Sequence, residues 1–543
     1  MTSVNMALSL MNHVVIGIIA AVIVGRIRSY LEERRFQRWA KQNGAEPAQR
    51  RVYSKLPFGI DGMVSDTYRI IKGADILDDI VAPRMASLNA NTVEIVIPEI
   101  TSDEYIIETV EPRNVQAVLA TKFEDWEIGE KRHRCFRVLL GNSIFTSDGE
   151  FWSHSRALFR PVFNKESIND LEETERASNI MIELLSETLE PNGWTPKVNL
   201  LDHFFRFTLD TSTAFLFGTT TDSQLAAAGK LERKTLQNVN GVEFDQDLSD
   251  SFRVAQEWLQ WRMIAGSFYF LVTAKKWREA AKKTLGFVDH YVQIALKRAE
   301  SRDLDKGNEN EKQRYDVLSE LATHCHDPTE LRDQILALLG AGRDTTASLL
   351  SWIWVELALN PDVFASLRKE VLETFTQDGT ITFADLKGFK FLQYVINETL
   401  RVHPPVPINS RQASKDTILP LGGGPDGTKP LAVRKDQLMA YDVYPMQRRK
   451  DIWGEDADEW KPERWVSRKI DWSFVPFSGG PRICLGQQYA ITEASYLTVK
   501  LLQAFDDIEW AGGDEKIGKG FTLTMSPAIG TPVRLRRVRR KSY

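Results

Sequence analysis

Cysteine is scarce in this sequence: Cys135, Cys325 and Cys484 are the three among 543 residues. An odd number this small cannot build a framework of disulfide bridges, so we expect a protein that works in a reducing compartment. A strong charge of one sign is lacking as well. Because the formal net charge of -5 gives no field that would gather nucleic acid, we expect no nucleic-acid partner.

Linker composition is also missing from the body of the chain, although its length alone would allow several domains. Hydrophobic residues make up 43% of the sequence, which is enough to bury an extensive core. We therefore expect one large globular body. Nothing in the sequence predicts an obligate oligomer.

The N-terminus carries a long uncharged run at residues 6–25. A helix of this length spans about 30 Å, the thickness of the hydrocarbon layer. A cleaved signal peptide would carry its basic residues before the apolar run, whereas Arg26 and Arg28 follow it here. Such a basic flank belongs on the cytosolic side of a membrane. A buried core helix is the alternative, because Asn12 and His13 interrupt the run.

These patterns predict four segments along the chain. Residues 1–5 form a lumenal end, residues 6–25 a transmembrane anchor, residues 26–55 a basic linker helix and residues 56–543 the globular domain. The catalytic body is then expected to face the cytosol.

Within the body, helical periodicity dominates. Strand-like runs punctuated by Gly and Pro occur mainly between Asp416 and Tyr444 and after Phe521. The charged segment from Ser301 to Arg314 has few apolar residues and is expected to be an exposed loop. The predicted fold class is mainly α with small β-sheets.

The longest helix signal begins at Asp327-Pro328, a cap followed by a proline in the first turn, and runs to Leu359. Asn360-Pro361 stops it. Gly340 and Gly342 fall at its centre, and each glycine costs about 1 kcal/mol of helix stability against alanine. A helix weakened in the middle indicates a functional reason.

A patterned segment, residues 477–486, surrounds the last cysteine. Two glycines and a proline make a tight turn that leaves Cys484 just before a helical run, where amide donors and the helix dipole lower the pKa of a thiol. A lone cysteine is more often an inert buried residue, but the patterned neighbours favour a metal ligand. Zinc is disfavoured because no second Cys or His lies nearby at ligand spacing.

This segment resembles the haem-binding signature of the cytochrome P-450 family, Phe-x-x-Gly-x-Arg-x-Cys-x-Gly. The resemblance implies that Cys484 is the axial thiolate ligand of the iron in a haem b. It implies further that Phe477 shields the sulfur and that Arg482 meets a haem propionate. Gly479 belongs to the tight turn of this cofactor-binding segment, and Gly486 at the helix start is expected to let the backbone approach the ring.

Two other segments resemble haem contacts of the same family. Trp152 and Arg156 match its Trp-x-x-x-Arg helix, in which the indole and the guanidinium contact a propionate. Arg411 matches another position that is used for a propionate. Ala341 and Gly342 match the oxygen-binding groove of the family's long central helix, which gives the weak helix centre a use.

Asp344 and Thr345 follow in the same groove motif. Taken alone, such residues are commonly no more than the polar face of a helix. Within the motif they are expected to be the catalytic acid-alcohol pair that delivers protons to the distal oxygen.

Glu398 and Arg401 resemble the family's Glu-x-x-Arg motif, and Arg464 lies in a segment that resembles the one completing a buried charge triad. Residues three apart share a helix face, and the apolar neighbours on that face indicate burial. A surface pair worth little is the alternative. If the triad is buried, loss of one member leaves an unpaired charge. Gln447 departs from the family, where relatives usually have His.

Three stretches look most like the fungal hydroxylases of n-alkanes and fatty acids: LGNSIFTSDGEFWSHSRALFRPVF, AGRDTTASLL and LPLGGGPDG. The resemblance implies a single-pass protein of the endoplasmic reticulum membrane that inserts one oxygen atom of O2 into a C–H bond of a lipophilic substrate, at or near a chain end. No dinucleotide fingerprint and no length for flavin domains are present, so NADPH is expected to act through a separate flavoprotein reductase.

Three alternatives remain open for the function. The serious one is a tailoring oxidation in fungal secondary metabolism, since the motifs would be the same. More remote are a haem isomerase or dehydratase and a haem sensor, neither of which needs the acid-alcohol pair.

Overall fold

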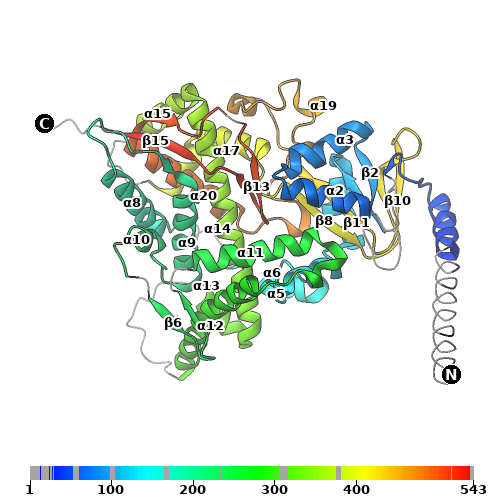
Figure 1. The fold of residues 1–543 in the computed structure, drawn as a ribbon, viewed down its shortest axis with the longest axis horizontal. Coiled ribbons are helices and arrows are strands. Elements are labelled where there is room, and N and C mark those ends of the chain that lie inside the picture. Colours follow the sequence, from blue (N-terminus) through cyan, green and yellow to red (C-terminus); the bar gives the residue numbers. More distant parts are fainter. Residues whose placement is uncertain are drawn as a thin grey trace, which may run out of the picture.

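The computed structural model describes residues 30–52, 60–97, 104–163, 170–232, 234–245, 248–304, 316–374, 381–514 and 516–538, together with His13, Val24 and Ile27. Most of the described chain is helical, and the strands form small sheets within a single domain. Helices gather at one end of the molecule and the largest sheet lies at the other (Figure 1). The predicted fold class is confirmed.

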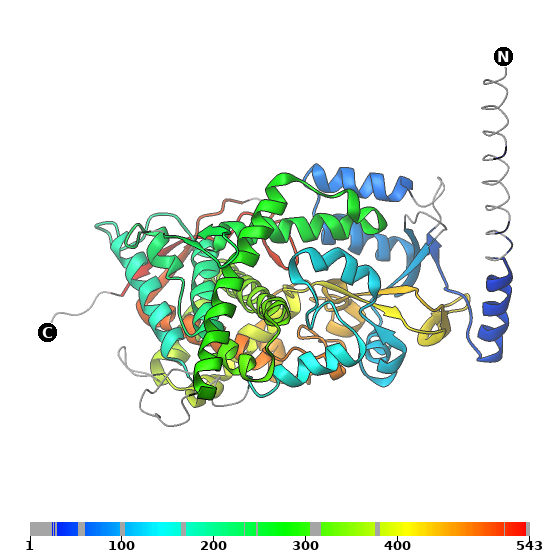
Figure 2. The same ribbon diagram turned by 90° about the horizontal axis from the view of Figure 1, so that it is seen from below.

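The long central helix α14 (Pro328–Leu359) runs through the middle of the body and appears nearly end-on in Figure 2. Its limits are those expected from the sequence. The Asp327 side chain accepts a hydrogen bond from the amide of Thr329, and Pro328 occupies the first turn, where its missing N–H costs nothing. Asn360 caps the other end.

Helices make up most of the rest of the described body, and several of them pack against α14. In chain order they are α2 (Ile60–Ile71), η2 (Ile76–Val81), α3 (Ala82–Leu88), α4 (Pro112–Gln116), η3 (Ala117–Thr121), η4 (Phe123–Asp125), α5 (Glu130–Leu140), α6 (Gly149–Phe159), α8 (Glu172–Glu187), α9 (Leu200–Phe217), α10 (Ser223–Ala227), α11 (Ser249–Ile264), η5 (Gly266–Leu271), α12 (Lys275–Leu304), α13 (Val317–His324), α15 (Pro361–Thr374), α16 (Phe383–Gly388), α17 (Lys390–Val402), α18 (Val443–Met446), α19 (Lys450–Trp453), η6 (Pro462–Val466), η7 (Gly480–Arg482) and α20 (Gln487–Ala504).

The largest sheet has the strand order β1-β2-β3-β11-β8-β4. These strands are β1 (Arg51–Val52), β2 (Thr92–Ile97), β3 (Glu104–Thr109), β4 (Trp126–Glu127), β8 (Ile408–Ala413) and β11 (Leu438–Asp442). The hairpin β2–β3 is antiparallel, and β11 joins β3 in parallel with Met439 opposite Ile107. The sheet therefore ties the first quarter of the chain to the segment that follows α17.

Smaller sheets complete the fold. The pairs are β6 (Thr235–Gln237) with β7 (Glu243–Asp245), β9 (Thr417–Gly423) with β10 (Lys429–Val433), and β13 (Lys519–Phe521) with β14 (Met525–Pro527); β12 (Phe505–Trp510), β15 (Pro532–Arg537) and β5 (Val198–Asn199) make a three-stranded sheet. The strands expected between Asp416 and Tyr444 and after Phe521 are present. The hairpin β2–β3 was not expected.

Two large hydrophobic clusters pack on α14, one at each end. Leu331, Ile335 and Leu339 belong to the cluster around the first half, whereas Leu350 and Trp354 belong to the cluster around the second half. The weak centre of the helix lies between them. Burial thus fixes both ends of α14 and leaves its centre available for a site.

The N-terminal predictions fall largely outside the described residues, including the anchor at 6–25. Among the described residues, no helix is long and apolar enough to cross a membrane. Residues 30–42 are helical, and the chain then turns into β1, so the helix is shorter than the linker expected at 26–55. Of the loop expected at Ser301–Arg314, the first residues continue α12 as far as Leu304.

Candidate active site

A cavity of about 290 Å³ lies between the centre of α14 and the segment that precedes α20. Ten of the predicted site residues line it: Trp152, Arg156, Ala341, Gly342, Thr345, Arg411, Phe477, Arg482, Cys484 and Gly486. Segments more than 300 residues apart in the sequence therefore meet at one place. Most other lining residues are apolar, among them Ile128, Ile144, Leu338, Leu349 and Val406.

The cysteine segment is shaped by its glycines. Gly480 has φ +64°, and a Cβ there would lie 1.7 Å from the carbonyl oxygen of Leu119 in η3. Gly479 has extended backbone at φ -162° and faces the ring of Trp472, and it does not line the cavity. Of the two glycines, Gly480 is thus the one whose backbone conformation demands glycine.

Cys484 follows this turn and is fixed by its own backbone. Its amide donates to the carbonyl oxygen of Phe477 at 3.0 Å, and α20 begins three residues later. Burial raises the pKa of the Cys484 thiol, while the amide of Gly486 and the charge of Arg156 lower it. The amide donor expected at the start of the helical run is therefore present at this thiol.

Four guanidinium groups converge on the cavity, from Arg132, Arg156, Arg411 and Arg482. Arg482 pairs with Asp148 at 2.6 Å and lies over the ring of Trp152, 4.2 Å from its centroid. The other three donate to carbonyl, amide or hydroxyl oxygens rather than to carboxylates.

This cluster holds more positive charge than the neighbouring acids neutralise. Burial lowers the pKa of Arg482 to about 9 and that of Arg132 to about 10, and nearby arginines add to both shifts. The Nε of Arg482 is buried without a hydrogen-bond partner among the described residues. An anion with two carboxylates would satisfy such a cluster, so the donor set fits the propionates of a haem.

Arg132 was missed by the sequence reasoning. It lies in the run EKRHRCFR on α5, where the charged neighbours made it look like part of a solvated face. In the structure its guanidinium is buried and donates to Asn409 Oδ1 at 2.8 Å and to the carbonyl oxygen of Ser410 at 2.9 Å. No signal in the single sequence distinguishes it from its neighbours.

On the opposite wall, Ala341, Gly342, Thr345 and Thr346 of α14 face the cavity. The Thr345 hydroxyl donates to the carbonyl oxygen of Ala341 at 2.7 Å, within the helix. A Cβ at Gly342 would lie 3.1 Å from Ser212 Oγ of α9, so glycine keeps this groove open. The small residues are placed as the motif implies.

Asp344 is not brought into the cavity. Its carboxylate is buried, 3.0 Å from Nη1 of Arg343, and accepts a hydrogen bond from the Gln256 amide of α11. Burial raises the pKa of Asp344, although both partners oppose the shift. Of the predicted acid-alcohol pair, Thr345 therefore lines the cavity, whereas Asp344 contacts Arg343 and Gln256 outside it.

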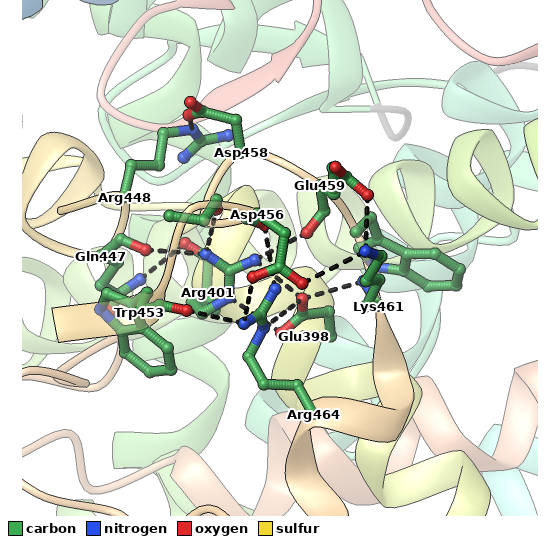
Figure 3. A network of polar contacts seen from close by, with 12 residues as sticks. Glu398, Arg401, Gln447, Arg448, Trp453, Asp456, Asp458, Glu459, Lys461 and Arg464 are labelled. Carbon is green, nitrogen blue, oxygen red and sulfur yellow. Dashed lines mark hydrogen bonds and ion pairs between the residues drawn. The ribbon is translucent and has the colours of Figure 1, made fainter. Parts of the chain in front are cut away.

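Two members of the predicted charge triad, Glu398 and Arg401, are buried on α17, and the third, Arg464, reaches them from η6 (Figure 3). Glu398 accepts hydrogen bonds from Arg401 at 2.7 and 2.9 Å, and Arg464 Nε lies 3.3 Å from its Oε1. The amide of Lys461 and the indole of Trp465 donate to the same carboxylate. The surface-pair alternative is wrong, because Glu398 and Arg401 are fully buried.

Gln447 takes part in the same network. Its side-chain amide donates to the carbonyl oxygens of Leu400 and Arg401 and accepts from the amide of Val475, which precedes the cysteine segment. Arg401 in turn donates to the Gln447 carbonyl oxygen at 2.9 Å. The departure from the family's usual residue therefore makes well-formed contacts of its own.

The domain is mainly helical, and the cysteine that precedes α20 shares a cavity with the glycine-containing centre of α14 and with four arginines. This arrangement defines a haem-thiolate protein. A family model described as "Cytochrome P450" matches residues 104–525. The chain belongs to the cytochrome P450 family.

Curated relatives cover most of the chain. Cytochrome P450 monooxygenase g430 of Fusarium sp is 42% identical over 431 residues, which is 79% of this chain and 75% of that protein. Cytochrome P450 52A5 of Candida maltosa is 43% identical over 439 residues, 79% of this chain and 80% of that protein. Cytochrome P450 monooxygenase alt2 of Alternaria solani is 40% identical over 441 residues, which is 78% of this chain and 80% of that protein.

Family membership settles the class of reaction. The protein is a monooxygenase that uses haem b with a thiolate ligand and receives electrons derived from NAD(P)H through a reductase, and it acts on lipophilic substrates. A haem isomerase and a haem sensor are thereby set aside.

Proposed function

We propose that the protein hydroxylates an alkyl chain, that of an n-alkane or a fatty acid, at or near its end. The apolar lining of the cavity carries this proposal. Ile128, Ile144, Leu338, Leu349 and Val406 offer no hydrogen-bonding side chain, so a saturated chain would be bound by the hydrophobic effect. The resemblance of the sequence to fungal alkane and fatty-acid hydroxylases supports the same substrate class.

We assign the site residues accordingly. Cys484 would hold the haem iron, Phe477 would cover the sulfur, and Gly486 would admit the ring edge. Arg156, Arg411, Arg482 and Trp152 would hold the propionates, together with Arg132. When bound, the haem supplies the activation of O2. Thr345 lines the cavity, and its hydroxyl would hold and pass on a proton there.

Membrane attachment is part of the proposal, with a single-pass anchor at residues 6–25 in the endoplasmic reticulum and a cytosolic domain. Support comes from exposed apolar side chains near the N-terminal part of the body. Tyr68 and Ile71 on α2 and Phe270 and Leu271 on η5 are more than half exposed, and these segments lie along the same edge of the molecule in Figure 2. Such side chains suit contact with lipid.

An NADPH-dependent flavoprotein reductase would dock on the face nearest Cys484.

Product analysis tests the proposal. The purified protein, reconstituted with reductase, NADPH and lipid, is incubated with alkanes, fatty acids and polycyclic lipids. We expect alcohols at or next to the chain end. Oxidation of a polycyclic lipid without any alkyl product would favour the tailoring role instead and would refute the chain-end assignment.

A further inference from the structure

Tyr441 on β11 places a buried hydroxyl at the end of the cavity where the arginines converge. The residue is 1% exposed and lines the cavity. Its hydroxyl oxygen has no hydrogen-bond partner within the described part of the chain. A buried tyrosine hydroxyl usually finds a partner, because leaving a buried polar group without a hydrogen bond is costly. A group that enters the cavity is therefore the natural partner of this hydroxyl.

The register of the largest sheet brings Tyr441 next to two of the arginines. Tyr441 stands opposite Asn409 of β8, and Arg411 lies two residues further along that strand. Side chains that stand opposite each other, or two apart on one strand, project from the same face of a sheet. The Arg411 guanidinium carbon lies 5.9 Å from the centroid of the Tyr441 ring. Arg132 reaches the same place from α5, since it donates to Asn409 Oδ1 at 2.8 Å.

Neutral acceptors hold the two guanidinium groups together. Arg132 and Arg411 both donate to Asn409 Oδ1, at 2.8 and 3.4 Å, and both donate to the carbonyl oxygen of Ser410, at 2.9 and 2.7 Å. Their acceptors among the described residues include no carboxylate. Two like charges at such short range repel each other unless an anion lies between them. Asn409 is thus a positioning residue that prepares two cationic donors for one anion.

We propose that Tyr441 is a cofactor-binding residue, which donates its hydroxyl hydrogen to the haem propionate that Arg132 and Arg411 hold at the same time. A carboxylate offers about four acceptor positions, so a single propionate can accept from all three side chains. The hydroxyl contributes a hydrogen bond without adding a further positive charge to the cluster. The inference rests on the haem site of the proposed function and adds to it the partner of this buried hydroxyl.

Loss of haem from the holoenzyme tests the assignment. Tyr441→Phe removes the hydroxyl and keeps the ring that lines the cavity. Because a hydrogen bond to a charged group is among the strong ones, we expect haem to pass to an excess of apomyoglobin about tenfold faster from this variant. Tyr496→Phe is the matched control, since Tyr496 is buried in the cluster around the second half of α14 and does not line the cavity. An unchanged or slower rate in Tyr441→Phe would overturn the proposal.

Resonance Raman spectra of the ferric holoenzyme report on the propionates without any turnover. The propionate bending band should shift in Tyr441→Phe and keep its position in Tyr496→Phe. A band at the wild-type position in both variants would count against the hydrogen bond from Tyr441.

A double variant tests whether Tyr441 and Arg132 hold the same carboxylate. Groups that share one partner are coupled, so the rate of haem loss from Arg132→Leu combined with Tyr441→Phe should differ by about threefold or more from the product of the two single changes. Single changes that simply multiply would show that the two side chains act on separate groups, and the shared cradle would be refuted.

Failure of the haem site itself has a different signature. Each purified variant is first reduced under carbon monoxide and checked for the absorption band of a thiolate-ligated haem. If wild type lacks the band, the proposed function fails. If wild type and Tyr441→Phe both show the band and lose haem at the same rate, the haem site stands and the role of Tyr441 alone is refuted.

Discussion

Asp344 and Thr345 are adjacent in the chain, yet Thr345 lines the cavity while the Asp344 carboxylate turns to Gln256 of α11. Replacing Thr345 with Val, which has the same shape and no hydroxyl, should lower product per NADPH by about tenfold or more. Thr345→Ser should recover most of it. Asp344→Asn should have the smaller effect, since its side chain reaches the cavity only after rearrangement. Equal coupling in Thr345→Val and wild type would contradict this assignment.

Cys484 is expected to be the ligand of the haem iron. Under carbon monoxide, the reduced protein should show the absorption band of a thiolate-ligated haem, and Cys484→Ala should lose it while the fold persists. Cys135→Ala provides the control, because Cys135 is buried in a hydrophobic cluster and does not line the cavity. A band that survives Cys484→Ala would place the ligand elsewhere.

The buried charge triad should stabilise the fold rather than the chemistry. Arg464→Ala leaves Glu398 with fewer donors in the interior, and breaking a buried ion pair costs about 3 kcal/mol. We expect a matching fall in the free energy of unfolding measured with urea. Lys450→Ala, which removes an exposed ion pair with Glu455, should change it little. Equal losses in both variants would show that the triad has no special weight.

Arg132 is expected to help hold the haem. Its loss removes one charge-assisted hydrogen-bond donor, which is worth about 1.5–3 kcal/mol, so the haem should dissociate at least about tenfold faster from Arg132→Leu. Transfer of haem to an excess of apomyoglobin measures the rate. Arg134→Leu on the same helix is the control, since Arg134 is exposed and pairs with Glu130. An unchanged rate in Arg132→Leu would remove Arg132 from the haem site.

His403 should make the stability depend on pH. It stacks on Trp352 at 3.8 Å and faces Glu356, and burial lowers its pKa to about 4 from an ordinary 6.5. Between these two values the unfolded chain binds a proton that the folded protein does not, so stability is lost as the pH falls from 6.5 towards 4. The loss should be roughly 2 kcal/mol between about pH 7 and pH 5.

The check on His403 is the difference between two pH series of urea unfolding. His403→Gln keeps a donor for Glu356 but does not titrate, so its stability should fall less over the same interval. If wild type and variant lose the same amount, the pH dependence has another source.

Much of the fold followed from local signals. The caps Asp327 and Asn360 fixed the limits of α14 because they act within one turn, and the glycines at its centre correctly marked the cavity wall. The hairpin β2–β3 was missed, because its strands gain their stability from a parallel partner, β11, that lies more than 300 residues away in sequence. Pairing over such distances leaves little trace in local periodicity.

The site was predictable where a motif specified it and not elsewhere. Cys484 and Arg482 stand in a patterned segment, whereas the place of Arg132 depends on which face of its helix is turned towards the cavity. The orientation of Asp344 was not predictable either, because it is decided by Gln256 on another helix. Gly479 and Gly480 look alike in sequence, and only the approach to Leu119 separates them.

The carboxylate of Glu398 is saturated with donors from α17 and from the segment just ahead of the cysteine loop. It anchors the segment that leads into the metal-binding loop and does not itself line the cavity. The cavity wall is therefore free to be remodelled over generations while the sulfur keeps its position. The contacts that hold the cysteine loop are thus distinct from the side chains that line the cavity. Substitutions in the lining can change the substrate while the metal ligand stays in place.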